Sequence, residues 1–257
     1  MKKYKISIVV CVADDKRIKN MLDSIKEKCE VVVVLNGATE EVKKIVEAYK
    51  HSAYFALNMV EIPERNLSKS RNIGMKSAHY DNVIFYDSDC VMTGGALKKY
   101  EEMFEKYMLV DGAVKFRSDT FQSKIISVQR SMGLPGYALC PSMGVRKDIV
   151  EKIGYYFDED IKWIEDSELN NRAKKENIEV GTIESLTCIH DNLTFKQDLK
   201  SAYRYGTGVK IAASKGLHKK RPTANWNLIM PCFKKKFLAG IYCIIWNMVY
   251  CFGYYFK

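Results

Sequence analysis

The sequence predicts an α/β protein built on a mixed, mostly parallel sheet that is flanked by helices. Three observations support this fold class: apolar, β-branched runs recur along the first third of the chain, segments of helical period separate them, and turn residues close them. Strands buried on both faces are typical of parallel sheets with right-handed crossovers. The 257 residues, 47% of them hydrophobic, suffice for one large domain with a sizeable core.

The expected elements follow in order from the N-terminus. Lys5–Val12 is a first strand, and the acidic residues just after it argue against a signal peptide. Apolar spacing and cap residues then predict the helix 15–28, the strand 30–35, the helix 39–49 with Thr39 as its N-cap, the strand 54–62, the helix 67–79 and the strand 82–86.

Two carboxylates follow the last of these strands. Asp87 and Asp89 flank Ser88 at the carboxyl end of strand 82–86, the edge at which open α/β sheets bind ligands. Carboxylates this close repel each other unless a cation offsets their charge, and a hard divalent metal with oxygen ligands does so. On these residues alone, a plain acidic turn is the competing interpretation.

The charge of the chain is uneven. Of the net +10, residues 196–257 contribute +11, from 12 Lys and Arg against the single acid Asp198, while residues 1–195 have 29 basic and 30 acidic residues. This asymmetry indicates an anionic partner surface or a solvated basic tail. The eight cysteines form no Cys-x-x-Cys pair and several lie in apolar runs, which favours a reducing compartment.

The tail ends in 20 uncharged residues, Phe237–Phe256, which follow the lysines 234–236. The length suffices for a spanning helix, but Asn247, Trp246 and several tyrosines make the run less apolar than a typical span. We favour an in-plane amphipathic anchor. A spanning helix with the lysines in the cytoplasm and a soluble helix within a dimer remain alternatives.

Four motifs occur in a fixed order along residues 5–210, and together they resemble the family 2 glycosyltransferases, which have the nucleotide-diphospho-sugar transferase (GT-A) fold. The motifs are Leu67–Gly74, Asp87–Asp89, Gly154–Glu159 followed by Trp163–Leu169 and Arg172, and Cys188–Asp191. The resemblance implies an inverting, metal-dependent glycosyltransferase, of hexosyl- or N-acetylhexosaminyltransferase type.

The resemblance also implies a metal centre. A leaving nucleoside diphosphate gains negative charge, which bound Mn²⁺ or Mg²⁺ stabilises as a Lewis acid. Asp89 is expected to ligate the metal directly. Asp87 is expected to belong to the metal site as well, through the ribose or a metal-bound water. Ser88 lies in the same nucleotide-sugar site. His190 is expected as a further ligand, which favours Mn²⁺ over Ca²⁺. A hydrogen-bonded histidine at a strand end is the alternative.

For the base, the resemblance points to Asp166. A sugar hydroxyl is a poor nucleophile, and a carboxylate that accepts its proton assists the attack. Glu165 and Asp166 open a predicted helix, whose dipole stabilises them as anions. Glu165 is expected to hold an acceptor hydroxyl, and Trp163 either stacks on the acceptor sugar or fills the core. Without the resemblance, both acids would be read as helix caps.

The nucleotide pocket departs from the family pattern in places. Arg71 matches the family's arginine, whose planar fork of donors suits phosphates or base carbonyls. Leu35 replaces the family's uracil-binding Asp, so we expect Asn36 to take that contact with a shifted loop. Backbone groups near Val12 are expected to hold the base. Arg204 could reach the diphosphate from a lid that bends at Gly206 and Gly208, or could belong to a solvated basic helix.

The expected protein is therefore a catalytic domain over residues 1–222 and a membrane-associating segment over 223–257. Its donor is a nucleotide-diphospho-sugar, with UDP-sugar favoured, and its acceptor a glycan or lipid-linked saccharide of bacterial surface polysaccharide synthesis. It is expected at the cytoplasmic face of an anionic membrane, without nucleic acid as a partner. The alternatives are a nucleotidyltransferase on a related fold and a non-catalytic basic membrane-binding protein.

Overall fold

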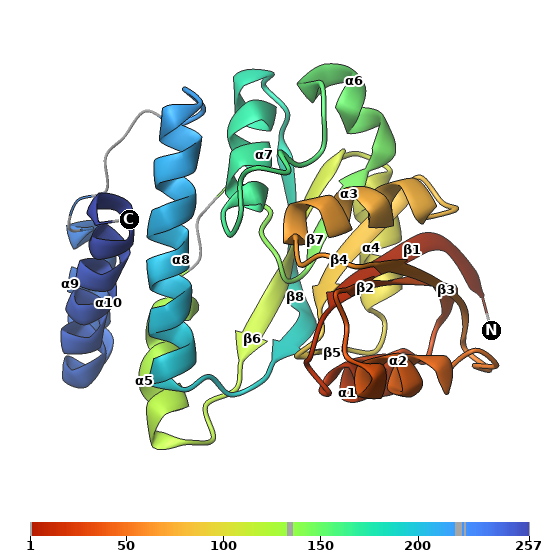
Figure 1. Cartoon of the computed structure of the whole chain (residues 1–257), viewed down its shortest axis with the longest axis horizontal. Coiled ribbons are helices and arrows are strands. Elements are labelled where there is room, and N and C mark those ends of the chain that lie inside the picture. The colour runs from red at the N-terminus through yellow and green to blue at the C-terminus, as the bar shows by residue number, and fades with distance from the viewer. Residues whose placement is uncertain (1, 133–135, 219–222, 224, 257) are drawn as a thin grey trace.

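One mixed sheet of eight strands, covered by helices, forms the body of the protein (Figure 1). The computed structural model describes residues 2–132, 136–218, 223 and 225–256. The strand order is β3-β2-β1-β4-β7-β6-β8-β5. The strands are β1 (Lys3–Val12), β2 (Lys28–Asn36), β3 (Phe55–Ile62), β4 (Asn82–Asp87), β5 (Cys90–Met92), β6 (Leu109–Phe116), β7 (Met143–Arg146) and β8 (Val180–His190).

The helices form two layers and one outer group. The layer helices are α1 (Ile18–Ser24), α2 (Glu40–Glu47), α3 (Leu67–Ser77), α4 (Ala96–Phe104), α6 (Val150–Ile153, after the 3-10 turn Lys147–Ile149) and α7 (Glu165–Lys175). The outer group is α5 (Phe121–Arg130), α8 (Phe195–Ser214), α9 (Trp226–Lys235) and α10 (Phe237–Tyr255). Alternate residues of β1 lie in separate cores on the two faces of the sheet, as the apolar strand pattern predicts.

The fold class predicted from the sequence is confirmed. Strands β1 to β4 are parallel neighbours, and the side chain of Thr39 accepts the Val42 N–H as the predicted N-cap of α2. One predicted range was too long: α1 covers only Ile18–Ser24 of the helix expected at 15–28. The backbone turns extended at Ile25, whose side chain is buried, and Lys28 already begins β2.

The second half of the sheet brings distant segments to one edge. β7 pairs antiparallel with both β4 and β6, whereas β6 and β8 run parallel. The short strand β5 pairs antiparallel with the end of β8, so that Cys90 lies opposite His190. This pairing holds the acidic turn after β4 against the end of β8.

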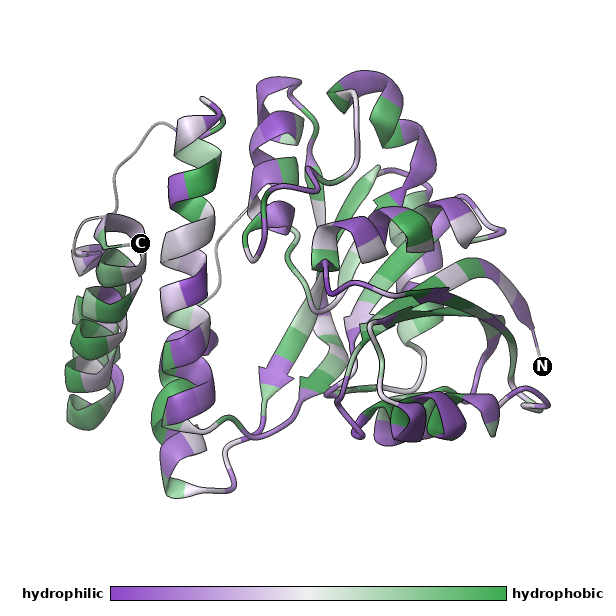
Figure 2. Ribbon diagram, viewed as in Figure 1, coloured by the Kyte–Doolittle hydropathy of each residue, from purple (hydrophilic) through white to green (hydrophobic). Residues whose placement is uncertain are grey.

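Helices α8 and α10 pack with their backbones in direct contact. A Cβ atom at Gly253 would lie 2.1 Å from the Tyr203 carbonyl oxygen, and one at Gly206 would lie 1.9 Å from that of Tyr250. Only glycine permits so close an approach. Among the described residues, α10 is the one helix long and apolar enough to cross a membrane by length and composition, and Figure 2 shows its mostly hydrophobic colouring.

A buried ion pair adds to this contact. The Asp198 carboxylate of α8 is fully buried, and it accepts hydrogen bonds from the Arg130 guanidinium of α5 and, at 2.6 Å, from the Tyr242 hydroxyl of α10. One carboxylate therefore connects three helices of the outer group.

Candidate active site

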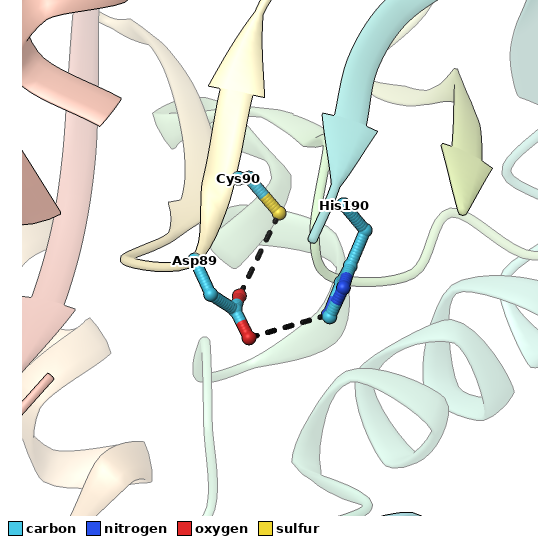
Figure 3. A group of neighbouring side chains, drawn as sticks. All are labelled: Asp89, Cys90 and His190. Atoms are coloured by element: carbon cyan, nitrogen blue, oxygen red, sulfur yellow. Dashed lines mark hydrogen bonds and ion pairs between the residues drawn. The ribbon is translucent and has the colours of Figure 1, made fainter. Parts of the chain in front are cut away.

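Two of the three predicted metal ligands, Asp89 and His190, lie together at the paired ends of β5 and β8, whereas Asp87 is not in this group. The Asp89 Oδ2 and His190 Nε2 atoms are 3.5 Å apart, and the Cys90 thiol points toward the other Asp89 oxygen at 3.8 Å (Figure 3). One donor atom from each of these three residues lies within 4.8 Å of the others. The two strands position the group because Cys90 and His190 are direct partners in the sheet.

The tautomer of His190 suits a metal ligand. Its Nδ1 atom lies 2.9 Å from the Asp191 carbonyl oxygen, which can only accept, so Nδ1 carries a proton and donates. In the neutral imidazole, Nε2 then presents a lone pair toward the Asp89 carboxylate. Two acceptors that face each other at 3.5 Å are stabilised by a cation between them, so this place suits a metal ion. Backbone-oriented imidazoles of this kind are typical of metal sites.

The thiol of Cys90 is a poorer ligand than its neighbours. Metals bind the thiolate, but burial raises the pKa of the Cys90 thiol well above its usual value. Asp89 and His190 are therefore the two residues in the described chain that fit Mn²⁺ or Mg²⁺ best, with open positions for phosphate oxygens and water.

A residue that the sequence analysis missed, Arg17, lies in the same cluster. Its guanidinium is 3.2 Å from an Asp89 oxygen and 3.5 Å from an Asp191 oxygen, and it pairs with Asp15 at 2.8 Å. Burial raises the pKa of the Asp15 carboxyl, but the hydrogen bonds and charge of Arg17 hold that pKa below its ordinary value. The Ser88 hydroxyl donates to Asp15 at 3.4 Å. The loop after β1 thus inserts one cation among three carboxylates.

A second buried cation, Arg71, joins the end of β4 to the start of α7. The guanidinium contacts the Glu165 carboxylate directly and lies 3.5 Å from an Asp87 oxygen. Burial raises the pKa of the Glu165 carboxyl to about 7, although Arg71 opposes the shift. The other Glu165 oxygen, Oε2, is buried and has no hydrogen-bond partner within the described residues. Because this oxygen is buried, a ligand hydroxyl does not reach it in this arrangement of the side chains.

The predicted base, Asp166, is oriented by backbone donors. Its Oδ2 accepts the Cys140 N–H at 3.1 Å, and its Oδ1 accepts the Ser167 N–H at 2.7 Å. It follows Glu165 at the N-terminus of α7, so it lies beside the Arg71 group that reaches β4. The loop that carries Cys140 includes residues 133–135, which lie outside the described residues.

Trp163 and Arg204, predicted independently, lie in contact. The Arg204 guanidinium is 4.1 Å from the centre of the Trp163 ring, a cation–π distance. The bending lid is wrong, since α8 is a continuous helix of 20 residues. Gly206 instead admits the backbone of α10, and Gly208 admits the Lys162 carbonyl, which a Cβ atom would meet at 2.4 Å.

The residues expected around the nucleobase lie at the ends of β1 and β2. Val12 is the last residue of β1 and pairs with Leu35. The Asn36 side-chain oxygen accepts the Asn66 N–H at 2.8 Å, which fixes the start of α3. A separate hollow of about 660 Å³ lies near Asp81 and Arg146, away from these residues. It contains no predicted site residue.

The topology of the sheet, the acidic turn after β4 and the histidine at the end of β8 are those of a GT-A nucleotide-sugar transferase fold. Comparison with known proteins points to the family. The profile described as "Glycosyl transferase family 2" matches residues 7–132, and this match supports a family 2 glycosyltransferase. It is 25% identical over 187 residues to the poly(ribitol-phosphate) beta-N-acetylglucosaminyltransferase TarS from two Staphylococcus aureus strains. The match covers 67% of this chain and 32% of TarS, so the chain spans about a third of these curated relatives.

Solved structures confirm the GT-A fold. S. aureus TarS 1–349 in complex with UDP-GlcNAc superposes with a TM-score of 0.59 at 16% identity, covering 100% of this chain and 93% of that one. The mannosyltransferase PcManGT from Pyrobaculum calidifontis, in complex with GDP-Man and Mn²⁺, superposes with a TM-score of 0.64 at 18% identity. The match covers 99% of this chain and 74% of PcManGT. At these identities the likeness concerns the fold.

Proposed function

We propose that this protein is an inverting, metal-dependent glycosyltransferase that moves a sugar from a nucleotide-diphospho-sugar to a hydroxyl acceptor. The observation that carries the proposal is one connected group of side chains. Asp89 and the Nε2 atom of His190 form a cation site, while Arg71 bonds Glu165 and approaches Asp87. The family match supports the same chemistry.

The residues divide the work between donor and acceptor. Asp89 and His190 would hold Mn²⁺ or Mg²⁺, which when bound offsets the charge of the leaving diphosphate. Asp166, held by two backbone N–H groups, accepts the proton of the acceptor hydroxyl as that oxygen attacks the anomeric carbon from the face opposite the leaving group. Glu165 is proposed to orient the acceptor hydroxyl, which requires its buried carboxylate to become accessible when ligand binds.

The donor side is proposed to bind a UDP-sugar. Asn36 and the backbone at Val12 would contact the base, Arg71, Asp87 and Ser88 would line the pocket near the metal, and Arg204 would approach the diphosphate. The relative TarS is described as an N-acetylglucosaminyltransferase and is solved with UDP-GlcNAc, which supports this donor class. The acceptor is proposed to be a glycan or a lipid-linked saccharide of bacterial surface polysaccharide synthesis.

The test separates binding from chemistry in one pair of variants. Asp166→Asn is expected to lower transfer by about 10²–10⁴-fold, because it removes the base. Donor binding with Mn²⁺, followed by thermal shift, should stay near the wild-type value, since Asp166 contacts the acceptor side. Asp160→Asn is the matched control, because its side chain is exposed and paired only with Lys215 in the described structure. Wild-type transfer by Asp166→Asn would remove the base from this proposal.

A further inference from the structure

The helices α9 and α10 carry exposed apolar side chains in a regular pattern. On α10 these are spaced alternately three and four residues apart, so they fall on one face of the helix. We call this face the apolar stripe; it consists of Leu238, Ile241, Ile245, Met248, Phe252 and Tyr255. On α9, Trp226 and Met230 are exposed at a spacing of one turn.

The opposite face of α10 is occupied by the protein. Gly253 contacts the backbone of α8, and Tyr242 bonds the buried Asp198. Asn247 is buried and bonds the Cys243 carbonyl within the helix. A single spanning helix would meet lipid on most of its surface, whereas one face of α10 is covered by the protein. The packing therefore favours an in-plane orientation over a spanning one.

The charge around the stripe selects the partner. From Leu199 to the end of the sequence there is no Asp or Glu. Lys234 and Lys235 are exposed at the end of α9, and Lys236 connects α9 to α10. A second copy of this chain would bring two basic segments together, which like charges oppose. An anionic bilayer offers both a hydrocarbon phase for the stripe and negative headgroups for the lysines.

We propose that the apolar stripe, with Trp226 and Met230 of α9 and the lysines 234–236, is a docking surface for the anionic cytoplasmic face of a membrane. Trp226 and Tyr255 are of the residue types enriched at headgroup depth. The eight unpaired cysteines are consistent with the reducing side of that membrane. The surface is independent of the sugar-transfer chemistry.

The experiment measures flotation of the full chain with vesicles. Wild-type protein should float with vesicles of phosphatidylcholine mixed with phosphatidylglycerol, bind pure phosphatidylcholine far less, and be released by salt. Met248→Glu with Phe252→Glu should weaken binding by at least about 100-fold, because two charges enter the hydrocarbon boundary. Replacing lysines 234–236 by Gln should weaken it by about fivefold per lysine.

Matched controls identify the surface. Tyr54→Glu near β3 and Lys98→Gln on α4 change exposed residues elsewhere and should leave vesicle binding intact. Met248 and Phe252 are 66% and 54% exposed, so the variants should keep Mn²⁺-dependent donor binding and a melting temperature close to that of the wild type, although Phe252 also packs against Tyr203. Equal flotation of the stripe variant and wild type would overturn the proposal. So would a wild-type dimer that the stripe variant abolishes, without any lipid binding.

Discussion

The buried carboxylate of Asp198 gives a prediction whose size follows from its contacts. In Asp198→Asn the side chain becomes neutral, while the Arg130 guanidinium, whose side chain is 20% exposed, stays in place. Removal of one partner from a buried ion pair typically costs about 3–5 kcal/mol. Because asparagine keeps an acceptor for Arg130 or Tyr242, we expect the lower end, about 3 kcal/mol.

Thermal unfolding measures this effect. A two-state chain of this length has an unfolding entropy of about 0.5 kcal/mol/K, so about 3 kcal/mol lowers Tm by roughly 6 °C. The double variant Arg130→Met with Asp198→Leu removes both charges and should recover most of the loss. Asp119→Asn, at an exposed position, is the control and should leave Tm unchanged. A drop below about 1 °C for Asp198→Asn, or a double variant worse than both single variants, would refute the reasoning.

Two further perturbations concern Asp111 of β6, outside the described site, and Arg17 within it. Burial raises the pKa of Asp111, whose carboxylate accepts the Leu139 N–H, to about 6 from an unfolded value of 3.8. The contribution of Asp111 to the free energy of unfolding should therefore be lost as the pH rises from 4 to 6. Above pH 6, Asp111→Asn should be more stable than the wild type by about 1–2 kcal/mol after screening, and below pH 4 it should show no gain. Urea titrations at each pH measure this difference. Arg17→Ala removes the cation beside Asp89 and should tighten Mn²⁺ binding in the absence of nucleotide by about five- to tenfold. Electron paramagnetic resonance of free and bound Mn²⁺ measures this change. Weaker binding would show that Arg17 does not compete with the metal.

The sequence could predict those parts of the site that lie at strand ends. Asp87 and Asp89 follow an apolar strand, so the edge they occupy was fixed by the strand pattern alone. Family motifs then named Glu165, Asp166 and His190, and the structure brings Arg71 against both Glu165 and Asp87. The proximity of Asp89 to His190 depends on the antiparallel pairing of β5 with β8, which no local pattern in the three residues of β5 indicates.

Other features depend on contacts between distant segments. Arg17 meets Asp89 and Asp191 across 72 and 174 residues of sequence, and its only local signal was a basic residue after Asp14 and Asp15. Gly206 and Gly208 suggested a flexible lid, because glycine permits bending and close packing alike. Only the neighbouring backbones of Tyr250 and Lys162 show that packing is the reason for both.

The position of α8 has a consequence for acceptor reach. Its Gly208 adjoins the Trp163 loop, while Gly206 adjoins α10. Of the apolar stripe, Phe252 packs against Tyr203 of α8, and the rest is exposed. Packed helices are about 8–10 Å apart, so two helix layers separate the lipid headgroups from Trp163 by roughly 20 Å. On the proposed membrane, a short glycolipid would not extend that far. On that proposal, the acceptors would be ones whose growing end stands off the bilayer on several sugar or phosphate units.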